Sequence, residues 1–293
     1  MDRPSFCAES SERSSRLQIL GGSDPRTAFG GSGADPAKAV GAASVLRAGS
    51  QTAENDRERK RSGRPGRRGA DMNDHEHAIE QYENGDFAEA LESFRALSAL
   101  SGNDTERLNY IGRCLTELGE WDEAAAIFDE AIRSQPEWER PYFNKAFVRL
   151  KQGRKDEAEW WARRAVKIDE DSEDAWYYLG LIFEKQGKKA AAKKCYKKSL
   201  LLEPEQEEPY INLGGLYWEE RQWDRSMEQF RQALRVNPGC GDALYNMALL
   251  HLDMNHLNES RELLKQLLES NPDDREAAEK LKEISIDTKG DSP

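Results

Sequence analysis

The chain has 293 residues, 33% of them charged, and a formal net charge of −12 at pH 7. This charge is unevenly spread, because residues 1–70 hold 13 basic and 8 acidic side chains while the remainder holds 30 basic and 47 acidic ones. An acidic remainder disfavours nucleic acid as a partner, since contacts to phosphates dominate that affinity. No apolar run approaches the length of a membrane span, so we expect no stable membrane insertion.

Residues 1–70 differ in composition from the rest of the chain. They contain ten Gly, ten Ser and ten Ala but only two Phe and no Trp or Tyr. Such a segment buries too little apolar surface to offset the entropy of ordering it, so we predict a disordered Gly/Ser/Ala/Arg-rich extension. Its basic end, Arg57–Arg68, is interpreted as a linker in preference to a nuclear-localisation or anionic-surface patch. No signal peptide of ordinary form is expected, because an apolar stretch is missing.

From residue 71 onward, residue types recur at a spacing of 34, which defines positions 1–34 of a repeat. Position 20 is small in every repeat: Ala90, Ala124, Ala158, Ala192, Ser226 and Ser260. Position 8 is also small: Ala78, Gly112, Ala146, Gly180, Gly214 and Ala248. Position 24 is mostly bulky: Phe94, Phe128, Ala162, Tyr196, Phe230 and Leu264.

Each unit of 34 predicts two helices, at about positions 3–14 and 17–30. The turn between them holds Gly in the first four units, then Arg221 and Asn255. Gly adopts a left-handed backbone freely and Asn tolerates it, but Arg does not, so we expect a different turn conformation at Arg221. Pro closes four of the six units because it cannot continue a helix. One helix pair cannot bury its apolar face alone, so neighbouring pairs must stack.

This spacing and these residue types resemble the tetratricopeptide repeat (TPR) family. The resemblance implies an all-α fold, a right-handed α-α superhelical solenoid of helix-turn-helix repeats with a C-terminal capping helix. The capping helix is expected over Arg275–Ile284, within a terminal segment 275–293. The first repeat starts near Met72, and translation starting there is one explanation for the different character of the preceding residues. Six repeats are expected, at 71–104, 105–138, 139–172, 173–206, 207–240 and 241–274.

Residues for catalysis, cofactor binding or metal binding form no convincing constellation, so we expect no enzyme activity, no cofactor and no metal site. The Gly-rich segment Gly30–Lys38 fits neither the Walker A nor the GxGxxG spacing. His251 and His256 are five residues apart, which is a poor spacing for one metal ion. The cysteines are interpreted as unpaired thiols of a cytoplasmic protein, with a lowered pKa of Cys195 beside lysines as the less favoured alternative. They are Cys7, Cys114, Cys195 and Cys240.

The functional prediction depends on the first helix of each repeat. In the TPR family, positions 2, 5, 6, 9, 12 and 13 of that helix line the concave surface. Asn recurs at position 6, and its amide offers a donor and an acceptor to an extended backbone. The two-carboxylate clamp of chaperone-tail-binding members is not supported, because position 5 never holds Lys. The predicted peptide-groove residues are Asn109, Arg113, Arg140, Phe143, Asn144, Phe147, Tyr177, Tyr178, Leu181, Asn212, Tyr245 and Asn246.

We therefore expect a non-catalytic adaptor that binds an extended or helical peptide segment of a protein partner. Segment Trp176–Phe183 is apolar or aromatic all round, which favours a face covered by a partner, with internal packing as the alternative. Two other functions stay open: a self-associating assembly protein that uses its ends or a lysine-rich convex face, and a regulatory subunit of an enzyme complex. The lysines are Lys185, Lys188, Lys189, Lys193, Lys194, Lys197 and Lys198. The partner and the oligomeric state are not determined by these patterns.

Overall fold

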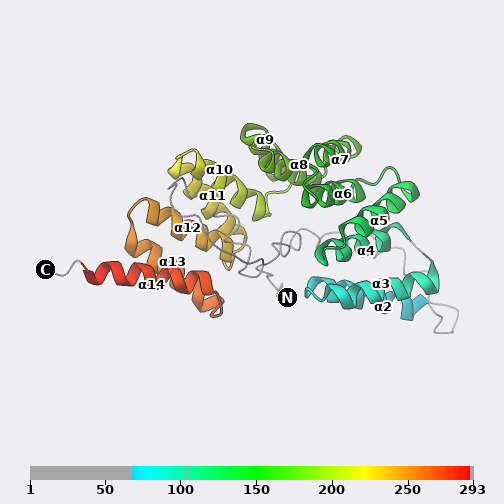
Figure 1. Ribbon diagram of the computed structural model, residues 1–293, viewed down its shortest axis with the longest axis horizontal. Coiled ribbons are helices and arrows are strands. Elements are labelled where there is room, and N and C mark those ends of the chain that lie inside the picture. Colours follow the sequence, from blue (N-terminus) through cyan, green and yellow to red (C-terminus); the bar gives the residue numbers. More distant parts are fainter. Residues whose placement is uncertain (1–67, 103, 291–293) are drawn as a thin grey trace, which may run out of the picture. The chain divides into compact units, whose positions relative to one another are not determined.

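The structure, a computed structural model, describes residues 68–102 and 104–290, and all thirteen regular elements in these residues are α-helices. They divide between two compact units, an N-terminal unit with α2–α9 and a C-terminal unit with α10–α14. Figure 1 shows each unit as a succession of helix hairpins. The predicted disordered extension lies outside the described residues up to 67, and its last three residues instead belong to α2.

The N-terminal unit consists of four helix pairs, and three residues separate the two helices of each pair. The helices of a pair pack together, and within this unit the second helix of each of the first three pairs also packs on the first helix of the next pair. The pairs are α2 (Arg68–Glu83) with α3 (Phe87–Ser101), α4 (Thr105–Glu117) with α5 (Trp121–Ser134), α6 (Arg140–Lys151) with α7 (Lys155–Ile168), and α8 (Glu173–Lys185) with α9 (Lys189–Leu202).

The C-terminal unit has two helix pairs and one further helix. Its last helix, α14, begins at the predicted Arg275 but continues beyond the predicted end at Ile284. Ala277 and Ile284 of α14 are buried in a cluster with Leu264 and Leu267 of α13, so α14 covers the apolar face of the last pair. The helices are α10 (Glu208–Glu219) with α11 (Trp223–Val236), α12 (Gly241–Asp253) with α13 (Leu257–Ser270), and α14 (Arg275–Gly290).

Two of the first helices begin at a side-chain cap. After the first pair, every second helix occupies positions 17–30, as predicted, but the first helices begin at position 1 or 2 and end at position 13. The Asp104 side chain accepts from the backbone N–H of Arg107 at 2.7 Å, and the Ser172 hydroxyl accepts from that of Ala175 at 3.2 Å. These two caps satisfy N–H groups of the first turn, while α6 and α10 begin without a side-chain cap but carry Pro in their first turn, where no N–H is needed.

Close contact between positions 8 and 24 determines how the two helices of a pair meet. In three pairs a glycine at position 8 lies against an aromatic ring at position 24, and no space remains for a methyl group. An added Cβ would lie 2.6 Å from Phe128 at Gly112, 2.7 Å from Tyr196 at Gly180 and 2.4 Å from Phe230 at Gly214. At position 8 of these three pairs, backbone-to-ring contact therefore requires glycine.

The Gly214→Ala substitution tests this contact. Because the new methyl group overlaps the ring of Phe230, which is fully buried, we expect a loss of about 1–3 kcal/mol in the free energy of unfolding. Gly215→Ala is the matched control, since a Cβ there meets nothing within 4 Å and Ala favours the helix. Urea unfolding of both variants measures the difference, and equal stability of the two would contradict the packing explanation.

The turns inside the pairs share one backbone conformation. Arg221 and Asn255 have φ values of 57° and 59°, in the same left-handed region as the four glycines of the other turns. The predicted exception at Arg221 is therefore wrong. The glycines are Gly85, Gly119, Gly153 and Gly187, with φ between 75° and 86°.

Hydrogen bonds show why Arg221 adopts this conformation. Its backbone N–H donates to Trp218 O at 2.8 Å, and that of Gln222 donates to Tyr217 O at 2.9 Å. These bonds from i to i−3 and from i to i−5 form the motif that satisfies the last carbonyls of a helix before a left-handed residue. Helix geometry and packing of the pair thus outweigh the steric cost of a side chain at this φ, which is about 1–2 kcal/mol.

Removing this strain should stabilise the protein. Arg221→Gly is expected to raise the free energy of unfolding by up to about 1 kcal/mol, because the steric cost exceeds the extra backbone entropy that glycine brings to the unfolded chain. Gly187→Ala is the reciprocal variant and should destabilise, since its φ is 77° although nothing lies within 4 Å of an added Cβ. Thermal unfolding followed by circular dichroism measures both, and a destabilising Arg221→Gly would show that the arginine side chain contributes more than its strain costs.

Candidate functional site

The predicted groove residues lie on the first helices of their pairs, in both units. In the structure, nine of the twelve are buried, and only Arg140, Asn212 and Asn246 are partly exposed. The buried nine are Asn109, Arg113, Phe143, Asn144, Phe147, Tyr177, Tyr178, Leu181 and Tyr245. Among the polar members, a partner can therefore reach the three partly exposed side chains more readily than the buried ones.

The aromatic residues of the N-terminal unit pack on one another. The rings of Phe143 and Tyr178 stack with centroids 4.8 Å apart, and Phe147 contacts the same tyrosine edge-on at 5.7 Å. Tyr177 packs on Tyr178 at 5.5 Å and on Tyr196 of the paired helix at 5.9 Å. These contacts favour internal packing as the reason for the apolar character of segment 176–183.

An asparagine pair connects two successive first helices of the N-terminal unit. Asn144 of α6 donates through Nδ2 to Oδ1 of Asn109 on α4 at 2.8 Å, and both side chains are buried. The pair satisfies part of the hydrogen-bonding capacity of each amide. Sequence patterns placed both residues on the same stripe but did not predict that they bond to each other.

The asparagines of the C-terminal unit have no such partner. Asn212 of α10 and Asn246 of α12 occupy position 6 of successive repeats, and their side chains form no hydrogen bond with the described residues. The amide nitrogen of Asn212 is nevertheless buried. A buried donor without an acceptor costs about 1–3 kcal/mol, so an added acceptor would stabilise the Asn212 amide, whereas the Asn246 side chain is partly exposed.

Arg113 is a buried cation held by tyrosine rings. Its side chain is 8% exposed, and its guanidinium carbon lies 4.4 Å from the ring centroid of Tyr82 and 5.3 Å from that of Tyr110. Burial acts to lower the pKa of Arg113, but the electrostatic influence of Tyr82, Tyr178 and Tyr110 raises it overall. Burial also raises the pKa of Tyr82. Tyr82 occupies position 12 of the first repeat, one of the positions expected on the concave stripe, but the predicted groove residues do not include it.

The surroundings of Cys114, Cys195 and the two neighbouring histidines decide thiol activation and metal-binding geometry. Burial raises the pKa of Cys114 to about 12 and that of Cys195 to about 11, so the lysines near Cys195 do not activate it. His251 and His256 meet across the α12–α13 turn with their Nδ1 atoms 3.4 Å apart, closer than their spacing suggested. Among the described residues, however, no group of three or more potential ligands gathers for a metal ion.

A second polar cluster supports the stacking of pairs. Lys145 of α6, only 3% exposed, pairs with Asp129 of α5 and lies 3.8 Å from the ring centroid of Trp161 on α7. Burial lowers the pKa of Lys145, while the bond to Asp129 opposes that shift. One lysine thus joins three consecutive helices.

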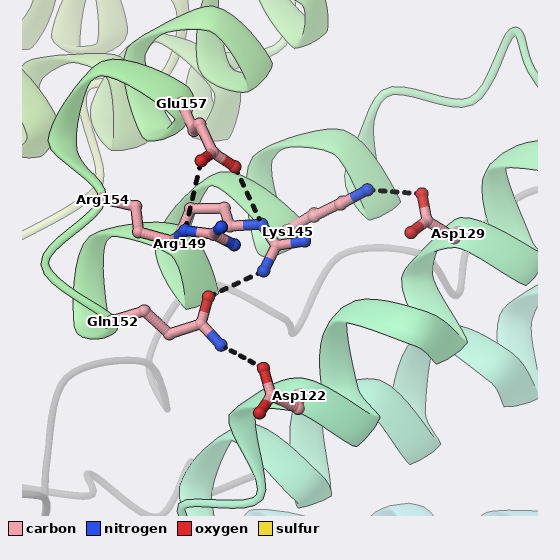
Figure 2. A network of polar contacts seen from close by, with 7 residues as sticks. All are labelled: Asp122, Asp129, Lys145, Arg149, Gln152, Arg154 and Glu157. Carbon is pink, nitrogen blue, oxygen red and sulfur yellow. Dashed lines mark hydrogen bonds and ion pairs between the residues drawn. The ribbon is translucent and has the colours of Figure 1, made fainter.

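The same cluster continues toward the α6–α7 turn, as Figure 2 shows. Arg149 donates through Nη1 to Gln152 at 2.7 Å, and Gln152 donates to Asp122 of α5 at 2.9 Å. Glu157 of α7 accepts from Arg154 at 3.1 Å and lies 3.5 Å from Nε of Arg149. Two of these contacts, from Gln152 to Asp122 and from Lys145 to Asp129, connect successive pairs, and the others lie within the pair α6–α7.

The lysine-rich face of α9 is partly engaged within the chain. Lys188 forms an ion pair with Glu159 of α7 at 2.7 Å. Lys189, Lys193 and Lys197 also have interactions of their own. The face therefore contributes to contacts inside the N-terminal unit as well as to its charge.

Models of known families identify the helix pairs. Four family models described as "Tetratricopeptide repeat" match residues 75–137, 139–172, 173–206 and 217–284. The chain belongs to the tetratricopeptide repeat family. This TPR protein is thus a protein-interaction scaffold in general terms, with a fold that is typically non-catalytic, and its fold class of stacked α-helix pairs is as predicted. None of its described helices is long and apolar enough to cross a membrane.

Solved structures show the same fold at low sequence identity. A chain of the APC/C hetero-tetramer Cut9–Hcn1 matches with a TM-score of 0.64 at 17% identity, over 73% of this TPR protein and 42% of that chain. Pseudomonas aeruginosa PilF matches with a TM-score of 0.57 at 18% identity, over 74% of this TPR protein and 99% of that chain. Yeast Tom70 matches with a TM-score of 0.61 at 16% identity, over 69% of this TPR protein and 44% of that chain. The TPR protein thus spans less than half of two of these chains, and no curated protein matches its sequence.

The contacts of Glu159 predict that the free energy of unfolding of this TPR protein decreases in acid. Burial acts to raise the pKa of Glu159, but hydrogen bonds from Lys188 and Arg163 lower it to about 2, from 4.5. The unfolded chain therefore binds this proton more readily than the folded one, so Glu159 stabilises the fold above pH 4.5 and loses that effect as the pH falls towards 2.

The Glu159→Gln variant should be less stable than the parent at pH 7, and the difference should shrink as the pH falls from 4.5 towards 2. Urea unfolding across this range measures it. Glu92→Gln, at an exposed position, is the charge-matched control. A stability difference between Glu159→Gln and the parent that does not change with pH would contradict the assigned role.

Proposed function

We propose that this TPR protein is a non-catalytic adaptor that binds an extended or helical peptide segment of a partner protein along the first helices of its repeats. A cytoplasmic location is part of the proposal. The observation that carries it is the pair of asparagine amides, Asn212 on α10 and Asn246 on α12, that form no hydrogen bond with the described residues; both occupy position 6 of their repeats. The buried nitrogen of Asn212 has a donor to satisfy, and a peptide carbonyl supplies the acceptor.

The chemistry of the amide suits backbone recognition. Each Asn side chain presents both a donor and an acceptor, so it bonds to the C=O and N–H groups of a peptide whatever its side chains are. Asn212 and Asn246 stand one repeat apart within a single unit, which allows one peptide to contact both.

The aromatic residues have a supporting part in this proposal. Phe143, Phe147 and Tyr178 are packed on one another, so they hold the first helices in place and leave the contacts to polar side chains. This differs from the predicted groove, in which these aromatic side chains were among the residues expected to contact the partner. Packed aromatic side chains favour a site formed before binding, which lowers the entropy cost of association.

An Asn212→Ala/Asn246→Ala double variant tests the proposal. A peptide is first selected with the full chain from a random display library, and its Kd is measured by calorimetry. We expect the double variant to bind at least about tenfold more weakly, since losing a bond to a buried partner costs about 1–3 kcal/mol.

Asn258→Ala is the matched control for that experiment. Asn258 lies on the second helix α13, is exposed and accepts from Arg261 at 3.0 Å, so it should not affect peptide binding. Circular dichroism establishes that each variant is folded. An unchanged Kd for a folded double variant would rule out the role of the two amides.

A further inference from the structure

The turn between α12 and α13 brings two imidazole rings together. His251 lies in the last turn of α12, and His256 directly precedes α13. Their Nδ1 atoms are 3.4 Å apart, whereas their ring centroids are 5.6 Å apart, so these two nitrogens face each other. His251 is partly exposed and His256 is exposed, so an ion can reach the pair from solvent.

The backbone of the turn enforces this approach. The backbone N–H of His256 donates to the carbonyl oxygen of His251 at 2.8 Å, which is the bond from i to i−5 that closes the helix end. The same bond joins positions 16 and 11 in the other five pairs, at 2.8–2.9 Å. In the fourth pair it holds Lys188 over the ring of Phe183, at 5.6 Å from the centroid. Side chains at these two positions are therefore neighbours in every pair, and in the sixth pair both are histidines.

The distance between the two nitrogens suits a shared metal ion better than a direct hydrogen bond. An N–H···N contact of 3.4 Å is longer than the usual hydrogen-bond range of about 2.7–3.2 Å. Two nitrogens that each lie about 2.0–2.1 Å from one ion at the tetrahedral angle are about 3.4 Å from each other. The Nδ1 atoms are therefore separated by the distance between two ligands of one tetrahedral ion.

The charges around the pair leave binding to the imidazoles themselves. Unperturbed imidazole is mostly neutral at pH 7, as a metal ligand must be. Glu259 in the first turn of α13 and Arg231 of α11 act electrostatically on His251 with opposite signs, so neither charge dominates. No third ligand gathers among the residues that the structure describes. The remaining coordination positions are thus left to water or to a group of another molecule.

We infer that Nδ1 of His251 and Nδ1 of His256 chelate a divalent transition-metal ion of the class of Zn²⁺, Ni²⁺ and Cu²⁺. Imidazole nitrogen is a preferred ligand of these ions, whereas Mg²⁺ and Ca²⁺ prefer oxygen. Among them, Cu²⁺ should bind most tightly, following the general order of affinities for divalent ions. This site does not depend on the proposed binding of a peptide to Asn212 and Asn246.

Calorimetric titration of the full chain with each of these ions, in a buffer that does not bind metals, tests the site. We expect one ion per chain that depends on both histidines, and no competition by Mg²⁺. His251→Ala and His256→Ala should each weaken its binding at least about tenfold, since each removes one of two ligands. Saturating Zn²⁺ should raise the midpoint of thermal unfolding of the parent and leave that of both variants unchanged, because the folded turn holds the ligands together.

His77→Ala is the matched control, because it removes an exposed histidine of α2 in the other unit and should bind the ion like the parent. Circular dichroism establishes that each variant is folded. Long-range ¹H–¹⁵N spectra of the histidine rings identify the ligand atoms, and Zn²⁺ should shift Nδ1 of both His251 and His256 in the parent.

Three results would overturn the inference. Equal binding by the parent and a His251→Ala/His256→Ala double variant would show an adventitious ion only. Weakening in just one of the two single variants would indicate contact with one imidazole, not a chelate. Shifts at Nε2 in place of Nδ1 would contradict the geometry of the turn. None of these results would bear on peptide binding, which the Asn212→Ala/Asn246→Ala variant tests separately.

Discussion

The contact between position 8 of a first helix and position 24 of its paired helix is the constraint on which the structure depends. A ring at Phe128, Tyr196 or Phe230 lies directly against the backbone of a glycine, at a distance where no Cβ fits. This contact sets the rotation of the first helix about its axis. Because positions 5, 6 and 9 belong to the same helix, their side chains are placed by a contact in which they take no part.

The two units use that shared geometry differently. In the N-terminal unit, Asn109 and Asn144 bond to each other, and the aromatic residues beside them form a packed stack. In the C-terminal unit, Asn212 and Asn246 remain without a bond to the described residues. Asparagine at position 6 thus connects two helices in the N-terminal unit, whereas in the C-terminal unit its amide forms no hydrogen bond with the described residues. Within one family fold, binding capacity depends on whether neighbouring side chains satisfy each other.

Much of the fold was predictable because small and apolar residues recur at the same positions in six repeats, and each recurrence predicts the same packing of two helices. The small residues at position 8 and the second helices at positions 17–30 follow from the period alone. Arg221 was mispredicted because local preference was weighed without the hydrogen bonds that end the helix. His251 and His256 were judged by spacing along a single helix, whereas a turn brings their rings together.

The sequence by itself determined the helix pairs, their order and the stripe on which a partner is expected, because periodicity records which residues must be small or apolar. Only the tertiary structure decided which polar side chains of that stripe form hydrogen bonds within the chain. Hydrogen bonding depends on distances between side chains of different helices, and no spacing along the chain specifies those. Arg113 shows the difference: the sequence placed it on the stripe, but only the tertiary structure shows that its guanidinium is buried against the rings of Tyr82 and Tyr110.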